Sequence, residues 1–484
     1  MPVPAPAIHD DFSLLLAADT FVHGRLANPP HPMAAYLDTF HVIQKPTYSS
    51  IYQPAQEAVL AIGQLLGHPW VGILLSMAGM CVAFTWMFQG WFPPGWALVG
   101  GLLALLRLDL FSYWLEGYWG GAVAAGGAAL VLGALPRVIH HRRVSDAFLM
   151  AIGAGLMANS RPVEGLIFCI PIGAVLLYWF LKTPRMESGF GPFLIVFVAV
   201  LGPVLAFMAY YNWRVTLNPL LFPHSLYVRN YTNYSIFIWQ APPPPLHYPN
   251  PQFEEFFNTW VRHEFHASWH LVWGKILDWG NFFVGSTLLI PLLAIPFVSR
   301  DKKMRLPLFL FFWCGLGLII VVYFEPHYAA PMAVAFFILL VQAMRHMRHW
   351  ELKGKPVGIF LTRLVVVLLL VRAGGLTLDA YRHPLADWST ERVHLVQQLE
   401  NSPGKHLVIV RYAPDHFVHH EWVYNGADVD GSKIVWAREI PGQDMTPLLN
   451  YFHNRKVWLL EADHKPRVLA PYVGPFSSQS EHAQ

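Results

Sequence analysis

Charged residues are scarce in this chain. Only 13% of its 484 residues are Asp, Glu, Lys or Arg, and 55% are hydrophobic, whereas soluble domains carry about 25% charged residues. Such a deficit is typical of a protein whose solvent is largely lipid. The net charge is only +3, and the basic residues occur in short clusters between apolar runs. This pattern argues against a nucleic-acid partner.

Cysteine is scarce as well. Cys81, Cys169 and Cys314 all fall inside apolar segments, so we expect small buried hydrophobic side chains and no disulfide framework. The histidines show no metal-ligand spacing, so the sequence identifies no metal site. A divalent cation as cofactor stays an open question.

Apolar runs of spanning length dominate the rest of the chain, each roughly 17–25 residues long. They lie near 69–89, 94–112, 118–137, 145–159, 162–181, 190–211, 278–298, 306–323, 328–345 and 357–377. The sequence therefore predicts an all-α polytopic membrane protein with about ten transmembrane helices in residues 69–377.

Four basic clusters predict the orientation of these spans. The clusters are Arg137 to Arg143, Lys182 to Arg185, Arg300 to Arg305 and Arg345 to Lys355. Lys and Arg mark cytoplasmic loops, and ten alternating spans place all four clusters on that side. Residues 1–68, 212–277 and 378–484 then lie on the outer side. Because no span precedes residues 1–68, we expect a further apolar helix upstream of Met1.

The three outer segments differ in pattern. Residues 1–68 contain two short helical patterns, Asp11 to His23 and Ala55 to Leu66, which we expect at the membrane surface. The large loop 212–277 contains an amphipathic pattern from Phe253 to His270. Residues 378–484 alternate strand-like and helical stretches, which predicts a small α/β domain. The strands are expected at His406 to Tyr412, Lys433 to Arg438 and Val457 to Glu461, and the helices at Ser389 to Glu400 and Met445 to Phe452.

The polar stretch from His9 to Gln56 contains the main candidates for chemistry. Adjacent carboxylates at Asp10 and Asp11 could serve as a general base, as metal ligands, or as caps of the following helix. From the residues alone, helix capping is the better interpretation. A capping carboxylate can also act as a base or a metal ligand, so these roles do not exclude each other. Lys45 precedes a proline and could anchor a lipid phosphate or snorkel at the interface. Asp19 is a further candidate in the same stretch.

Other candidates lie at the ends of apolar runs. Glu116 and Asp109 are acidic residues at or inside a span, which makes them site candidates. Arg161 could contribute to a site, but pairing with Glu164 at a helix start is the simpler interpretation. His327 could bind a phosphate or a metal, although a lone histidine is more often structural.

The motifs resemble those of the C-type glycosyltransferases, and in particular the bacterial protein O-mannosyltransferase and lipid A aminoarabinose transferase group. Asp10-Asp11 resembles the Asp-Glu motif of that group, and Lys45-Pro46-Thr47-Tyr48 resembles its Lys-Pro-Pro-Leu-Tyr stretch. The resemblance implies that Asp10 is the catalytic acid, with Asp11 beside it. It also implies that Lys45 contacts the donor phosphate, and it places Tyr48 in the same motif.

The resemblance implies an enzyme of the bacterial inner membrane. It would move a sugar from a polyprenyl-phosphate-linked donor to a protein, lipid or glycan acceptor on the extracytoplasmic side. Two other functions fit the composition: a transporter or flippase of lipid-linked saccharides, and a non-catalytic membrane scaffold. A transporter would have polar or broken helices near the midplane, whereas the polar candidates here gather at one face. A scaffold leaves the stretch from His9 to Gln56 without a role.

Overall fold

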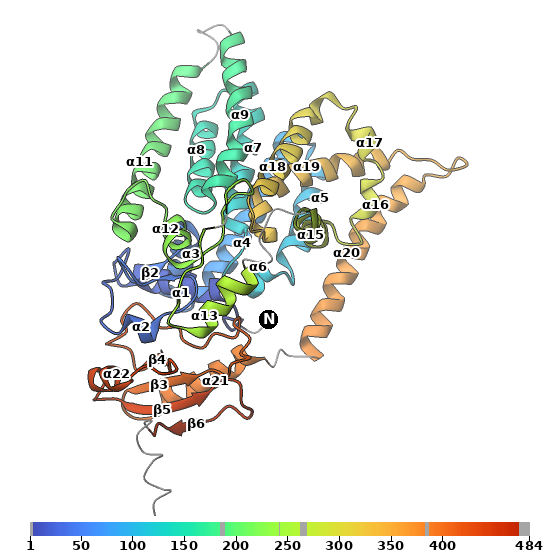
Figure 1. The fold of residues 1–484 in the computed structure, drawn as a ribbon. Helices are drawn as coiled ribbons and strands as arrows, with labels where there is room; N and C mark the ends of the chain where they lie inside the picture. Colours follow the sequence, from blue (N-terminus) through green and yellow to red (C-terminus); the bar gives the residue numbers. More distant parts are fainter. Residues whose placement is uncertain (1–2, 184–188, 242, 262–268, 383–386, 474–484) are drawn as a thin grey trace, which may run out of the picture.

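The computed structural model describes residues 3–183, 189–241, 243–261, 269–382 and 387–473 (Figure 1). A body of long helices stands at one end, and a small β-sheet domain formed by the C-terminal residues stands at the other. The helices α1 (His9–Val22), α2 (Ala34–Leu37) and α3 (Pro54–Leu65) lie between the two. The protein is a mostly helical, multi-pass membrane protein with a small C-terminal α/β domain, as the sequence predicts.

Within the described residues, seven helices are long and apolar enough to cross a membrane. They are α4 (Pro69–Trp91), α7 (Ala122–His141), α9 (Pro162–Lys182), α11 (Phe190–Thr216), α18 (Arg305–Ile320), α19 (Ala330–Met347) and α20 (Val357–Arg382), with α18 and α19 each extended by a preceding 3-10 turn. Two further apolar helices, α5 (Pro94–Ala104) and α8 (Val144–Ala158), are shorter. These nine helices cover nine of the ten predicted spans.

The predicted span at 278–298 is wrong as a single helix. The chain there forms the end of α15 (Trp269–Trp279), a π-helical turn η3 (Gly280–Val284), and the short helices α16 (Leu289–Leu292) and α17 (Ile295–Val298). Gly285 has a positive φ of +57°, and two prolines follow it. A left-handed residue and missing backbone donors both interrupt a helix.

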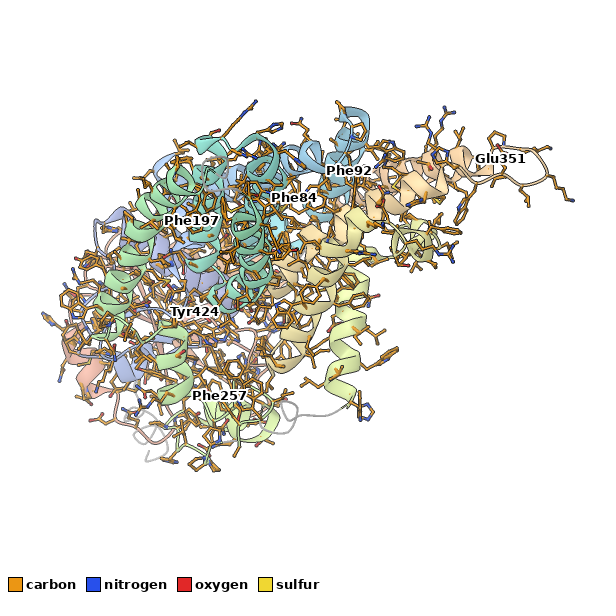
Figure 2. The ribbon with its side chains drawn as sticks, turned by 90° about the horizontal axis from the view of Figure 1, so that it is seen from above. Phe84, Phe92, Phe197, Phe257, Glu351 and Tyr424 are labelled. Atoms are coloured by element: carbon orange, nitrogen blue, oxygen red, sulfur yellow. The ribbon has the colours of Figure 1, made fainter. Side chains whose placement is uncertain are left out.

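Helix α19 forms the centre of the body, whereas α11 and α20 lie at its edge. In α19 94% of the apolar window is buried, against 0% in α11. Helices α7 and α8 approach each other closely at Gly127 and Gly153. A Cβ atom added at Gly153 would lie only 2.4 Å from the carbonyl oxygen of Gly127. Small residues at a helix contact are the usual way for membrane helices to pack without a hydrophobic driving force. A hairpin carrying Glu351 projects from the body between α19 and α20 (Figure 2).

The loop 212–277 is only partly helical. Helix α12 (Pro223–Tyr231) is followed by α13 (Pro251–Glu255) and by a π-helical turn η2 (Phe256–Val261). The predicted amphipathic helix from Phe253 to His270 therefore begins in α13 and η2, and part of its remainder lies outside the described residues.

The C-terminal domain contains every element that the sequence predicts there. Its helices are α21 (Trp388–Asn401) and α22 (Thr446–Tyr451), and its strands are β3 (His406–Arg411), β4 (Ile434–Arg438), β5 (Lys456–Glu461) and β6 (Leu469–Pro471). The order is β4-β3-β5-β6, with β3 parallel to β4 and β5, and β6 antiparallel to β5. The short edge strand β6 was not predicted.

The C-terminal domain packs on α1 and on the chain that follows it. The Phe12 ring stacks on the Tyr424 ring at a centroid distance of 4.1 Å. The hydroxyl of Tyr36 donates to the Asp444 carbonyl at 2.6 Å, and the hydroxyl of Tyr48 donates to the Asn425 carbonyl at 2.9 Å. The four rings of Phe12, Tyr36, Tyr48 and Tyr424 belong to one apolar core across the contact. We call this contact the seam.

Candidate functional site

Asp10 lies on the first turn of α1 and is held by two side chains of the following loop. The Tyr52 hydroxyl donates a hydrogen bond to its carboxylate, and the His41 Nδ1 atom lies 3.6 Å from the second oxygen. Burial raises the pKa of Asp10, but the charge and hydrogen bond of His41 and the hydrogen bond of Tyr52 outweigh this effect and hold the pKa well below its usual range. Asp10 is therefore ionised at neutral pH and can accept a proton.

Asp11 faces a different environment. Its carboxylate accepts hydrogen bonds from the backbone N–H groups of Ala7 at 3.1 Å and Tyr118 at 2.7 Å. Burial is the main cause that raises its pKa to about 6. Helix α1 begins at His9, with Ile8 at the N-cap position, so neither carboxylate occupies the cap itself. Asp11 instead ties the start of α1 to the chain before α7.

A cavity of about 230 Å³ opens beside Asp10, and we call it the aromatic chamber. Eight of its seventeen lining residues are Phe, Tyr or Trp, four are His, and two are the carboxylates Asp10 and Glu325. Among the lining residues that the structure describes there is no Lys or Arg. His419 reaches the chamber from the loop between β3 and β4, so the C-terminal domain supplies part of its wall.

A second, smaller cavity of about 40 Å³ adjoins the chamber, and we call it the Arg161 cavity. Asp10, Tyr52 and Trp119 line both cavities and form the wall between them. Arg161 and His327 line only the smaller one. The smaller cavity thus has a permanent cation on the far side of the Asp10 wall.

Neighbouring aromatic residues orient both basic side chains of this cavity. The Arg161 guanidinium carbon lies 4.0 Å from the centre of the Tyr328 ring. The Tyr113 hydroxyl lies 3.1 Å from the His327 Nδ1 atom and also accepts a hydrogen bond from the His327 backbone N–H at 2.9 Å. Among the described residues Arg161 and Glu164 form no direct ion pair, but their charges attract each other. Arg161 also lines the cavity.

An apolar groove of about 450 Å³ shares Val123 with the Arg161 cavity. It runs along α4, α7 and α8, and its lining includes Val82, Trp86, Leu130 and Leu156. A groove of this composition fits a hydrocarbon chain.

The structure thus brings together three of the predicted site residues, Asp10, Arg161 and His327. The others lie elsewhere. Tyr48 is buried in the seam, and Asp19 accepts hydrogen bonds there from the Ala427 backbone N–H at 2.7 Å and from Gln64 at 3.0 Å. Glu116 is exposed at the end of α6 (Tyr113–Glu116). Lys45 is also exposed, and its backbone N–H donates to the Tyr231 hydroxyl at 2.9 Å. Neither residue lines the chamber or the Arg161 cavity.

The sequence analysis did not identify four residues of the site: Tyr52, His41, Trp119 and Glu325. Tyr52 directly precedes the Gln53-Pro54 start of α3, and Glu325 lies two residues before His327. These positions were visible as motifs, but their meeting at Asp10 depends on the tertiary fold. Burial raises the pKa of Glu325 to about 7. In the described residues no group of three or more His, Cys, Asp or Glu side chains is placed to hold a metal ion.

The arrangement of a polytopic helical body, a polar N-terminal segment beside it and a small α/β domain is shared with solved structures. The chain is similar to the crystal structure of ArnT from Cupriavidus metallidurans in the apo state, with a TM-score of 0.50 and 13% identity over 94% of this chain and 89% of that chain. The structure of the same protein bound to undecaprenyl phosphate matches with a TM-score of 0.50 and 12% identity, over the same shares of both chains.

A third solved structure is the Archaeoglobus fulgidus oligosaccharyltransferase tethered with an acceptor peptide. It matches at 12% identity over 84% of this chain and 58% of that chain, and its TM-score of 0.46 adds nothing to the fold assignment. No protein-family model and no curated protein matches the chain.

Proposed function

We propose that the protein is a membrane glycosyltransferase that uses a polyprenyl-phosphate-linked sugar as donor. The observation that carries this proposal is the position of Asp10. It is an ionised carboxylate in the wall between a cavity with a half-buried cation and a chamber lined by aromatic residues. The similarity of fold to ArnT, which has been crystallised with undecaprenyl phosphate, agrees with such a donor.

In the proposed mechanism the donor phosphate lies in the Arg161 cavity and its prenyl chain lies in the apolar groove. Arg161 is the phosphate ligand, because guanidinium groups bind phosphate through charge-assisted hydrogen bonds, and His327 stands beside it. An acceptor hydroxyl attacks the anomeric carbon of the sugar from the chamber side. The bond between this carbon and the phosphate oxygen breaks, the polyprenyl phosphate leaves, and Asp10 takes the proton of the hydroxyl.

Tyr52 and His41 keep Asp10 ready for this step. Their contacts with the carboxylate hold it in one orientation and lower its pKa. A low pKa makes a weak base, so proton transfer would occur late, when the attacking oxygen has become acidic. Asp11 would position α1 through its two backbone hydrogen bonds and would not contact the substrates.

Lys45 has a separate place in the proposal. The resemblance assigns it to the donor phosphate, but its side chain is exposed and Arg161 is the cation of the cavity. Lys45 would therefore contact the donor phosphate only while the donor enters the site, and not in the bound complex. The proposal places the site and the C-terminal domain on the extracytoplasmic side of a bacterial inner membrane. With the interrupted segment from α15 to α17 counted as one crossing, the four basic clusters then face the cytoplasm.

Transfer and transport can be separated by the bond that changes. The purified full chain is reconstituted in liposomes with a radiolabelled polyprenyl-phosphate-linked hexose and a mixture of envelope acceptors. A transferase breaks the bond between sugar and phosphate and moves the label out of the donor-lipid fraction. A flippase moves the lipid between leaflets with this bond intact. An intact donor after many equivalents of enzyme, with several donor sugars tried, would refute the proposal.

A further inference from the structure

We propose that the aromatic chamber is the acceptor site and that it selects a hydroxyl-bearing, sugar-sized group without negative charge. This inference rests on the proposed function and deepens it, because it narrows an acceptor that the sequence leaves open. Three features carry it: the position of the chamber relative to Arg161, its charge, and its lining.

The position follows from the geometry of displacement. In a single displacement at a sugar carbon, the attacking oxygen and the leaving group stand on opposite faces of the ring. The Arg161 cavity and the chamber lie on two sides of a wall formed by Asp10, Tyr52 and Trp119. If the phosphate occupies the side with the cation, the attacking group must enter from the chamber.

The charge of the chamber disfavours an anion. Asp10 is ionised, and Glu325 adds a second acidic side chain, whose pKa burial raises to about 7, so that only part of the molecules carry its charge at neutral pH. Burial lowers the pKa of His9, His224 and His419, so these rings are neutral near pH 7. The described part of the lining supplies no Lys or Arg, and the fourth histidine, His41, already lies against the Asp10 carboxylate and offsets part of that charge alone. An acceptor carboxylate or phosphate placed near Asp10 would be repelled, which corresponds to a loss of affinity of about tenfold or more.

The lining suits a sugar-like group. Tyr and Trp side chains present flat apolar faces together with polar edges, and such surfaces match the alternating C–H and O–H groups of a carbohydrate. The volume of about 230 Å³ is below the roughly 300–1,000 Å³ of pockets for drug-sized ligands. The chamber therefore takes one monosaccharide-sized group or a side chain at a time. His419 in this wall makes the C-terminal domain a determinant of acceptor choice.

The test measures binding of simple probes to the full chain in nanodiscs, without any donor. The probes are methyl glucoside, methyl glucosaminide and methyl glucuronide, which share a ring and differ in charge, and their affinities are compared by saturation-transfer NMR. We expect the neutral and the amine probe to bind and the glucuronide to bind about tenfold more weakly. Glu325→Gln should narrow this gap, and His419→Ala should weaken all three probes.

Glu351→Gln provides the matched control, because Glu351 is exposed in the hairpin that projects away from the body (Figure 2). It should leave all three affinities unchanged. Equal or tighter binding of the glucuronide overturns the inference, and so does the absence of binding by all three probes. The binding test contains no donor, so it is independent of the donor-cleavage assay. If the probes bind with the expected selectivity but the protein never cleaves a donor lipid, the proposed function is refuted and the chamber remains only a binding site for such groups.

Discussion

The same substitution at the adjacent carboxylates Asp10 and Asp11 should have different main effects, on turnover at Asp10 and on stability at Asp11. Asp10→Asn keeps the size of the side chain and can still accept the hydrogen bond of Tyr52, but an amide cannot take a proton. General-base catalysis contributes about 10²–10⁴-fold, so we expect kcat/KM to fall by this factor, equivalent to about 3–5 kcal/mol of transition-state stabilisation. The melting temperature should also fall somewhat, because the low pKa of Asp10 means that its charge, held by His41 and Tyr52, stabilises the folded state.

Asp11→Asn should mainly affect folding. The carboxylate of Asp11 accepts two backbone N–H groups, one on each oxygen. An amide has one acceptor oxygen, so either Ala7 or Tyr118 would lose its partner and face an N–H₂ group. A buried donor without a partner costs about 1–3 kcal/mol. We therefore expect a clear drop in melting temperature, with turnover per folded molecule reduced far less than in Asp10→Asn.

Both variants are assayed in the same liposomes. Activity is measured as the rate of donor cleavage, and stability is measured by thermal unfolding of the purified protein. The folded fraction is used to normalise turnover. Near-normal turnover of Asp10→Asn would refute the role of Asp10 as base. Inactivity of both variants with unchanged melting temperatures would mean that the two carboxylates act together in the chemistry, against the geometry described above.

Three further predictions follow from other parts of the structure. Arg161→Gln should raise the donor KM by roughly 10–100-fold, as expected for the loss of a charged hydrogen-bonding partner. Lys45→Ala should raise the donor KM less. A larger effect of Lys45→Ala than of Arg161→Gln would mean that Lys45 is the main phosphate ligand. Burial raises the pKa of Glu57 in α3 to about 8 from a usual value of 4.5, so the folded state keeps a proton that the unfolded state has released. The free energy of unfolding should then fall as the pH rises from about 4.5 to 8, and Glu57→Gln should flatten this slope in thermal melts; an unchanged slope would contradict the assignment. The Tyr424 hydroxyl lies 2.8 Å from the His9 Nδ1 atom, so Tyr424→Phe should reduce kcat a few-fold through a looser start of α1 while the Phe12 stack remains; a variant with full activity would show that this bond does not position Asp10.

The sequence was most informative where the pattern is local. Apolar runs and strand periodicity predicted nine of the ten spans and all but one element of the C-terminal domain. The prediction failed at 278–298, where composition indicated a span but Gly285 and two prolines interrupt the helix. Hydropathy averages over a window and does not register such breaks, which depend on single residues.

The site was predicted only in part for a different reason. Asp10 is recognisable because its motif is contiguous, whereas Tyr52, Trp119 and Glu325 come from three separate segments and meet only in the folded chain. Lys45 matches a motif, yet the fold leaves its side chain exposed. A sequence motif gives only the order of residues along the chain. The lining of the cavity depends on which of their side chains face inward, and the motif does not specify this.

The seam has a consequence for how the protein is made. The ribosome produces α1 first and the loop between β3 and β4 some four hundred residues later, yet Tyr424 and Ala427 of that loop contact His9 and Asp19 of α1. The nascent chain therefore carries Asp10 through almost all of its synthesis without the wall that His419 supplies. If Asp10 is the base and the chamber is the acceptor site, as we propose, a half-made chain in the membrane has a base but no complete acceptor chamber. Transfer then has to wait until the loop between β3 and β4 has been made and has packed against α1.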